Sequence, residues 1–145
     1  MKQAASTHRA GTAFWLALAG TAWLLAMGLA SNASSPQNAT VKPLQAVGLS
    51  HDESKELSMI TVEYPPGGST PAHTHRAQAL LYVLEGSIVM QVKGRAAVTL
   101  SAGQTWYEGP DDVHFVSRNA SNSAPARYVV FMVKDKGAPI LTPVK

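Results

Sequence analysis

The sequence contains no cysteine, few charged residues and, after its first thirty-three residues, no long apolar run. Without cysteine there are no disulfides, thiolate ligands or cysteine nucleophiles, so a metal site would have to use histidine, carboxylate, amide or water ligands. Only 14% of the 145 residues are charged, whereas 46% are hydrophobic. This balance excludes an intrinsically disordered chain and is sufficient for one packed core.

The basic residues do not gather along the sequence. The formal net charge of +3 includes Lys2 and Arg9, which belong to the N-terminal segment. Without residues 1–33, ten basic and nine acidic residues remain, a net charge of +1, and the basic ones are spread singly. Because nucleic-acid binding requires a clustered positive surface, we expect no nucleic-acid partner.

Residues 1–33 have the pattern of an export signal. A positively charged start is followed by an uncharged stretch over 11–30, and small residues then offer a cleavage site at Gly28-Leu29-Ala30 or at Ser31-Asn32-Ala33. The alternative is an uncleaved membrane anchor, because the stretch is close to the ~20 residues of a spanning helix. In both cases we expect an N-terminal signal helix and a domain in the periplasm or secreted, with the membrane contacted only through this segment.

The rest of the chain predicts a linker followed by one all-β domain. Residues 34–50 have linker composition, with at most a short strand near 44–48. Over residues 51–145, short apolar runs alternate with turn residues, which favours a β-sandwich or β-barrel. We expect strands at 57–64, 79–84, 87–92, 96–100, 105–108, 113–117 and 127–134.

Three histidines are the candidate site residues. His73 and His75 are two apart in an extended segment, so both imidazoles can face the same side of a strand. His114 begins a later strand, and an antiparallel barrel can bring it opposite the pair. Three neutral imidazoles that leave positions open are a common arrangement for a catalytic divalent metal. The alternative is a surface or core pair of histidines with no metal.

The chain resembles the cupin superfamily over about residues 57–134. The first cupin motif, Gly-x5-His-x-His-x3,4-Glu-x6-Gly, corresponds to the segment from Gly67 through His73 and His75 to Gly86. The second motif, Gly-x5-Pro-x-Gly-x2-His-x3-Asn, corresponds to the segment from Gly103 to His114, although Gly109 and Asp111 replace its proline and second glycine.

This resemblance implies a cupin-type antiparallel β-barrel, or jelly roll, with an internal metal bound by the three histidines and a glutamate. The glutamate position of the first motif falls on Ala79, which cannot bind a metal. Gln78 is adjacent, but its strand parity is wrong unless a bulge turns it inward. Glu108 is the other candidate for a fourth ligand or pocket residue, while a glutamate before a Gly-Pro turn is more often solvated.

The expected function is that of an exported small cupin that binds or transforms a small organic molecule at a divalent metal, in the manner of an oxygenase or isomerase. Zn, Mn, Fe, Ni and Cu are all compatible with such ligands. The alternative is a non-catalytic cupin that captures a small molecule or a metal, and the fold does not decide between the two. By analogy with small cupins we expect a homodimer, with strand 128–133 in its interface.

Overall fold

The computed structural model describes residues 38–144, so the predicted signal or anchor at 1–33 and its helix lie outside the described residues. Within residues 38–144 the chain forms eleven strands and no helix. A search of this part of the chain for helices able to cross a membrane finds none. The prediction of an all-β domain is confirmed.

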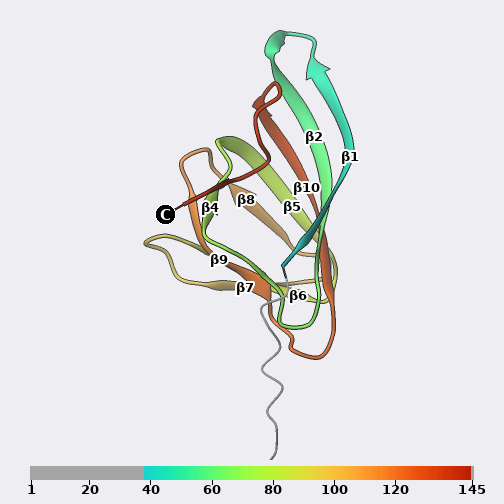
Figure 1. Ribbon diagram of the computed structural model, residues 1–145, viewed down its shortest axis with the longest axis vertical. Helices are drawn as coiled ribbons and strands as arrows, with labels where there is room; N and C mark the ends of the chain where they lie inside the picture. Colours follow the sequence, from blue (N-terminus) through green and yellow to red (C-terminus); the bar gives the residue numbers. More distant parts are fainter. Residues whose placement is uncertain (1–37, 145) are drawn as a thin grey trace, which may run out of the picture. The chain divides into compact units, whose positions relative to one another are not determined.

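The strands form two antiparallel sheets (Figure 1). One has the order β1-β2-β10-β5-β8 and the other the order β11-β4-β9-β6-β7, with β3 also paired to β9. Non-consecutive strands lie side by side in both sheets, as in a jelly roll. The bounds are β1 Thr40–Leu49, β2 Asp52–Tyr64, β3 Ser69–Thr70, β4 His73–Thr74, β5 Ala77–Glu85, β6 Ser87–Val92, β7 Val98–Ser101, β8 Thr105–Glu108, β9 Val113–Asn119, β10 Ala126–Asp135 and β11 Thr142–Pro143.

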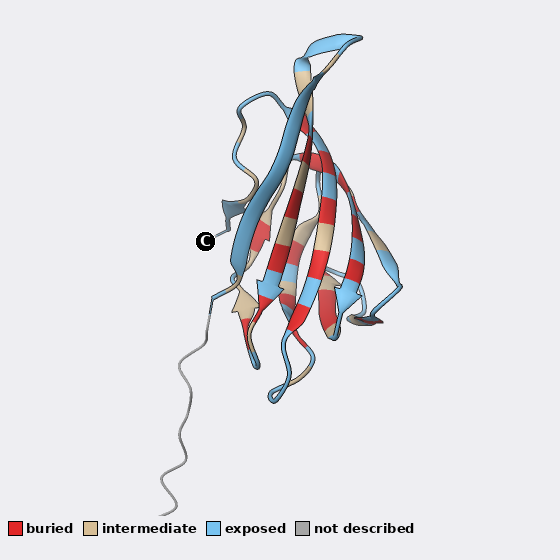
Figure 2. Ribbon diagram, turned by 90° about the vertical axis from the view of Figure 1, so that its right-hand side faces the viewer, coloured by how far each residue is buried: buried red, intermediate tan, exposed pale blue. Residues whose placement is uncertain are grey.

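The core lies on the inner faces of the sheets. Strands β5 and β10 alternate strictly between buried and exposed residues, which is visible as stripes in Figure 2. This is the period of two that places one face of an antiparallel strand on the core. The core residues of these two strands include Leu81, Val83, Val130 and Met132, each at most 4% exposed. The inward-facing residues of these two strands also support the site described below.

The predicted linker at 34–50 contains a full strand of the first sheet. β1 pairs with β2 from Thr40↔Glu63 to Leu49↔Asp52, so the sheet begins well before the predicted domain boundary at residue 51. β1 gave no apolar alternation because almost all of its residues are exposed and it contains Pro43 and Gly48. Its position depends on backbone pairing with β2, which sequence patterning does not report.

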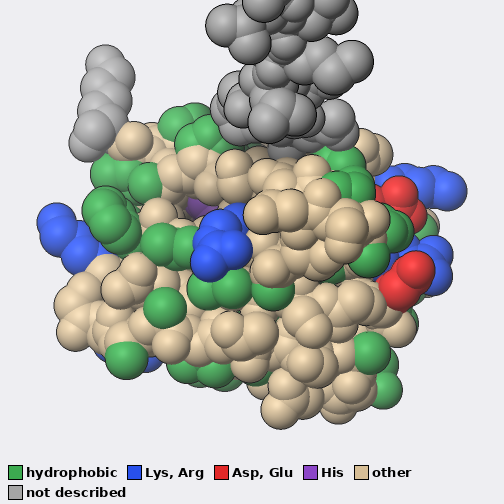
Figure 3. All heavy atoms as spheres, turned by 90° about the horizontal axis from the view of Figure 1, so that it is seen from below, with side chains coloured by type: hydrophobic (Ala, Val, Ile, Leu, Met, Phe, Trp, Pro, Cys, Tyr) green, Lys and Arg blue, Asp and Glu red, His purple; other side chains and the backbone are tan. Residues whose placement is uncertain are grey.

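Charged side chains are dispersed on the lower face of the domain. In Figure 3 the lysine and arginine side chains stand apart from one another, and acidic side chains lie next to basic ones at one edge. This agrees with the scattered basic residues of the sequence.

Candidate metal centre

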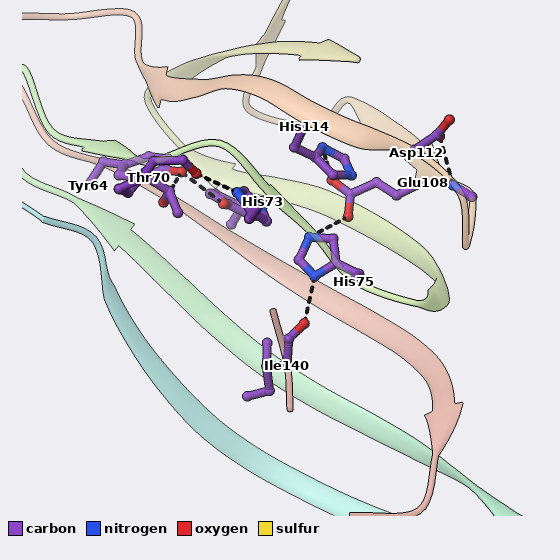
Figure 4. A network of polar contacts seen from close by, with 11 residues as sticks. Tyr64, Thr70, His73, His75, Glu108, Asp112, His114 and Ile140 are labelled. Carbon is purple, nitrogen blue, oxygen red and sulfur yellow. Dashed lines mark hydrogen bonds and ion pairs between the residues drawn. The ribbon is translucent and has the colours of Figure 1, made fainter. Parts of the chain in front are cut away.

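Two neighbouring strands bring the three predicted histidines together. β4 pairs with β9 so that His73 lies directly opposite His114, and His75 follows one residue after β4. The ring centroids are 4.8 Å apart for His73 and His75, 5.1 Å for His73 and His114, and 5.0 Å for His75 and His114. The three rings are therefore mutual neighbours, and Figure 4 shows His75 and His114 with Glu108 between them.

A backbone turn directs the chain away after the second histidine. Arg76 has φ of 44°, the only non-glycine residue with positive φ in the described chain from 38 to 144. This left-handed conformation costs an L-residue about 1 kcal/mol or more. It ends the extended segment of His73 and His75 in one sheet and starts β5 in the other, so His75 sits where the two sheets meet.

Backbone carbonyls set the protonation of two of the rings. His73 Nδ1 donates to Pro71 O at 2.7 Å, and His75 Nδ1 donates to Ile140 O at 2.7 Å. Because a carbonyl oxygen can only accept, Nδ1 carries the proton in both rings and Nε2 keeps its lone pair. This is the usual way in which a protein orients a metal-binding histidine. The third ring, His114, is 1% exposed, and neither of its nitrogens has a hydrogen-bond partner among the described residues.

Glu108 is the fourth member of the cluster. It ends β8 and is 2% exposed, with Oε2 at 3.4 Å from His75 Nε2 and Oε1 at 3.7 Å from His114 Nδ1 (Figure 4). The expectation that a glutamate before a Gly-Pro turn is solvated is therefore wrong here. Trp106, two residues earlier, packs against the core, and this shared strand parity is the signal that places Glu108 inside.

Gln78 does not reach the site. It is exposed on the outer face of β5, opposite Val133, and β5 has no bulge near it. Its neighbour Ala79 points inward, is 1% exposed and lies directly opposite Glu108 on β8. The carboxylate is therefore supplied across the strand pair from the position where the family motif has its glutamate.

Burial keeps the histidines neutral and the carboxyl protonated at moderately low pH. Burial, with the nearby Asp112, raises the pKa of Glu108 to about 7. Burial lowers the pKa of His114 to about 4, and repulsion from His75 and His73 adds to this shift. Burial also lowers the pKa values of His73 and His75. A dication in this site would favour the ionised form of Glu108 and offset the cost of burying it.

The donor set fits a divalent metal. Donor atoms of His75, Glu108 and His114 all lie within 4.8 Å of one another. Three ligands placed ~2.0–2.2 Å from one ion lie about 3.3–3.8 Å apart, so the two histidines would have to approach each other by up to about 1 Å to share it. His73 lies outside this closest set, but its ring is adjacent to both other rings. Both nitrogens of His114 lack a hydrogen-bond partner among the described residues, and a metal bound to one of them would satisfy that orphaned atom.

A small internal cavity adjoins the cluster. The volume accessible to water molecules is about 30 Å³. The residues that line the cavity include His73, His75, Glu108, Thr70 and Ser117. Within residues 38–144, no lysine or arginine lines it. A water molecule needs roughly 10–15 Å³ on this measure, so the cavity has room for about two waters beside the cluster.

The comparisons with known proteins agree with this geometry. The family description "Cupin domain" matches residues 60–132, half of the chain. The chain belongs to the cupin family. The match spans the three histidines and Glu108, and the jelly-roll arrangement of the strands is the fold that the resemblance implied.

Individual relatives are more distant. The rhicadhesin receptor of Pisum sativum is 35% identical over 68 residues, which are 43% of this cupin and 31% of the receptor. A DMSP lyase from Ruegeria pomeroyi DSS-3 is 20% identical, with a TM-score of 0.54 over 61% of this chain and 43% of the lyase. An oxalate oxidase in complex with the substrate analogue glycolate is 23% identical, with a TM-score of 0.58 over 77% of this chain and 57% of the oxidase. The cupin spans about a third to just over half of these proteins, and the structural likenesses show a shared fold.

The C-terminal segment contributes to the site. Ile140 supplies the carbonyl that orients His75, and β11 pairs with β4 through Thr142↔Thr74 and Pro143↔His73. A backbone carbonyl carries no side-chain signal, so sequence reasoning had no means of finding this contact.

Proposed function

We propose that this cupin binds one divalent metal through His73, His75, His114 and Glu108, and binds or transforms a small organic molecule beside it. The observation that carries the proposal is that His75 and His114 meet on the buried carboxyl group of Glu108, with the ring of His73 beside both and with Nδ1 of His73 and His75 tied to backbone carbonyls. When bound, the metal would act as a Lewis acid that polarises an oxygen of the ligand. Zn, Mn, Fe, Ni and Cu remain compatible with three nitrogens and one oxygen.

The protein's own groups prepare this chemistry in three ways. The carbonyls of Pro71 and Ile140 keep the proton of His73 and His75 on Nδ1, which leaves each Nε2 lone pair free to bind a metal. Burial removes water from Glu108, so its carboxylate is a strong partner for a cation and otherwise holds a proton. Apolar core residues such as Met90 and Met132 line the rest of the cavity, which limits the solvent at the site.

Elemental analysis tests the metal site. The mature protein is purified without chelator or affinity tag, and its metal content is compared with that of a His75→Ala variant. We expect about one metal per chain in the wild type and a large loss in the variant. Equal contents in the two proteins would remove the main support for the site.

A non-catalytic binding protein is the second candidate, and the size of the cavity favours it. Roughly two waters fit beside the histidines, so an organic substrate would need the C-terminal segment to move. Calorimetric titration of the metal-loaded protein with small carboxylic and hydroxy acids, followed by product analysis, separates the two. Conversion of a bound acid supports an enzyme, and tight binding without conversion supports a binding protein.

Export to the periplasm or outside the cell is part of the proposal. It is supported by the charged start, apolar stretch and small residues of segment 1–33. Intact-mass measurement of protein from the periplasmic fraction tests it. Cleavage after Ala30 or Ala33 supports a signal, whereas full-length protein in the membrane fraction indicates an anchor.

A second copy of the chain is the partner we propose for the exposed side of the first sheet. The outer apolar face consists of Leu57, Leu80, Tyr107, Phe131 and Val133, each 37% to 56% exposed. Register pairs make it continuous, because Leu80 lies opposite both Tyr107 and Phe131, and Val133 lies opposite Leu57.

The rim of this face carries charges of both signs, such as the Lys55–Asp135 pair. In a dimer with two-fold symmetry, the apolar faces of the two copies would therefore pack against each other, and charges of opposite sign would meet at the edge of the interface. Only alternate residues of strand 128–133 are available, since Tyr128, Val130 and Met132 belong to the core. Light scattering at micromolar concentration should give a dimer mass, and Leu80→Lys should give a monomer; a monomeric wild type contradicts the proposal.

A further inference from the structure

A bulge places a serine beside the histidine cluster. His114 and Ser117 are three apart in β9, a spacing that puts residues on opposite faces of a regular strand. The pairing of β6 with β9 shifts its register between Gln91 and Val92, which marks a β-bulge. Both His114 and Ser117 consequently point inward, at 1% and 3% exposed.

The hydroxyl of Ser117 has no partner among the described residues. Its Oγ is fully buried, makes no hydrogen bond and lines the same cavity as His73, His75 and Glu108. A buried hydroxyl left unpaired costs roughly 1–3 kcal/mol, and such groups in proteins usually have a role or an unseen partner. The bulge and the unpaired hydroxyl together indicate that this serine serves something inside the cavity.

A second hydroxyl faces the same space. Thr70 lies directly opposite Ser117 in the β3–β9 pair and also lines the cavity. Tyr128 OH donates to Tyr64 OH at 3.3 Å, and Tyr64 OH lies 2.8 Å from Thr70 Oγ1. Either oxygen of the Tyr64–Thr70 pair can donate, and when Tyr64 donates to Thr70 the hydrogen of Thr70 is free to point into the cavity.

We propose that Ser117 and Thr70 form a hydrogen-bond donor subsite for a small ligand held between them and the metal. The subsite rests on the proposed metal site. A cavity of about 30 Å³ without lysine or arginine selects a hydrogen-bond acceptor of two or three heavy atoms, neutral or singly charged. The hydroxyls bind its acceptor atom and fix its orientation; they do not neutralise its charge.

Azide is the probe for this subsite, since it is a triatomic acceptor that binds metal ions. The wild-type protein is loaded with Co(II), whose visible spectrum reports both metal uptake and azide binding. Loss of one hydrogen bond to an anion such as azide corresponds to about a tenfold to hundredfold change in affinity. We expect Ser117→Ala and Thr70→Val to raise the azide dissociation constant by this factor and to leave the Co(II) dissociation constant unchanged. Ser123→Ala, on an exposed loop, should bind azide like the wild type.

Each outcome decides between the two proposals. If Co(II) binds but azide binds equally well to wild type, Ser117→Ala and Thr70→Val, or does not bind, the subsite is wrong and the metal site stands. If Co(II) does not bind, the metal site is wrong. The infrared stretch of azide in the metal-free protein then tests the hydroxyls alone: a bound band that Ser117→Ala removes supports them, and its absence in the wild type overturns them.

Discussion

Ala79 and Glu108 lie directly opposite each other on β5 and β8, and both point into the barrel. The position of Ala79 is the one at which the cupin motif has a glutamate. Directly paired residues in an antiparallel sheet have Cβ atoms about 4.5–5.5 Å apart, so a carboxylate on either strand can reach the same space. The alanine leaves room that the longer side chain of Glu108 occupies.

Exchanging these two residues should preserve metal binding. Glu108→Ala removes the only carboxylate of the cluster and should weaken metal affinity by at least the roughly tenfold to hundredfold known for lost supporting groups. The double variant Ala79→Glu with Glu108→Ala should recover most of that loss. Competition titration with a fluorescent chelator measures both. If the double variant bound metal as weakly as Glu108→Ala alone, the prediction would be contradicted, because a carboxylate on β5 could then not replace the one on β8.

The metal-free protein should lose stability as pH rises because of Glu108. Its pKa is raised from the ordinary 4.5 to about 7 when folded, so above pH 4.5 the unfolded state releases a proton that the folded state still holds. Stability is therefore full below pH 4.5 and falls until pH passes 7, by about 3 kcal/mol in total.

Glu108→Gln removes this titration and is the matched comparison. Urea unfolding in chelator at pH 5 and pH 8 should show a larger drop for the wild type than for the variant. The histidines contribute equally to both proteins, so the difference isolates Glu108. Equal drops would mean that Glu108 is not desolvated.

Asn119 should be a structural residue of the turn after β9. It is 2% exposed, its Nδ2 donates to Pro65 O at 3.0 Å and to Ala124 O at 2.8 Å, and its Oδ1 accepts from Ser121 N at 2.8 Å. Asn119→Ala leaves these buried groups unpaired and should lower the free energy of unfolding by about 3 kcal/mol. Asn122→Ala, on the exposed turn nearby, should change it by less than about 0.5 kcal/mol. Chemical denaturation compares them, and similar values would contradict this role.

Gly86 should tolerate no side chain, whereas Gly94 should tolerate one at moderate cost. Both have left-handed φ, of 70° and 82°. A Cβ at Gly86 would lie 2.5 Å from Pro125 O, while at Gly94 it would meet nothing within 4 Å. Gly94→Ala should therefore cost about 1 kcal/mol from backbone strain alone, and Gly86→Ala clearly more. Thermal unfolding of the two variants measures the gap, and equal losses would argue against the close approach.

The sequence predicted the parts of this molecule that depend on local pattern. The apolar run at 127–134 predicted strand β10, and the two-residue spacing of His73 and His75 predicted that their rings lie together. The long edge strand β1 was not predicted, because its residues are exposed and do not alternate between apolar and polar. The place of Glu108 depends on which residue of β5 lies opposite it. That register is fixed by packing across the whole sheet, and no short window of sequence contains it.

Anomalous diffraction from crystals of the metal-loaded protein tests the central claim most directly. The account predicts one strong peak about 2.0–2.3 Å from a nitrogen of each of His73, His75 and His114 and from an oxygen of Glu108. A peak elsewhere, or one that Glu108 does not touch, would contradict it.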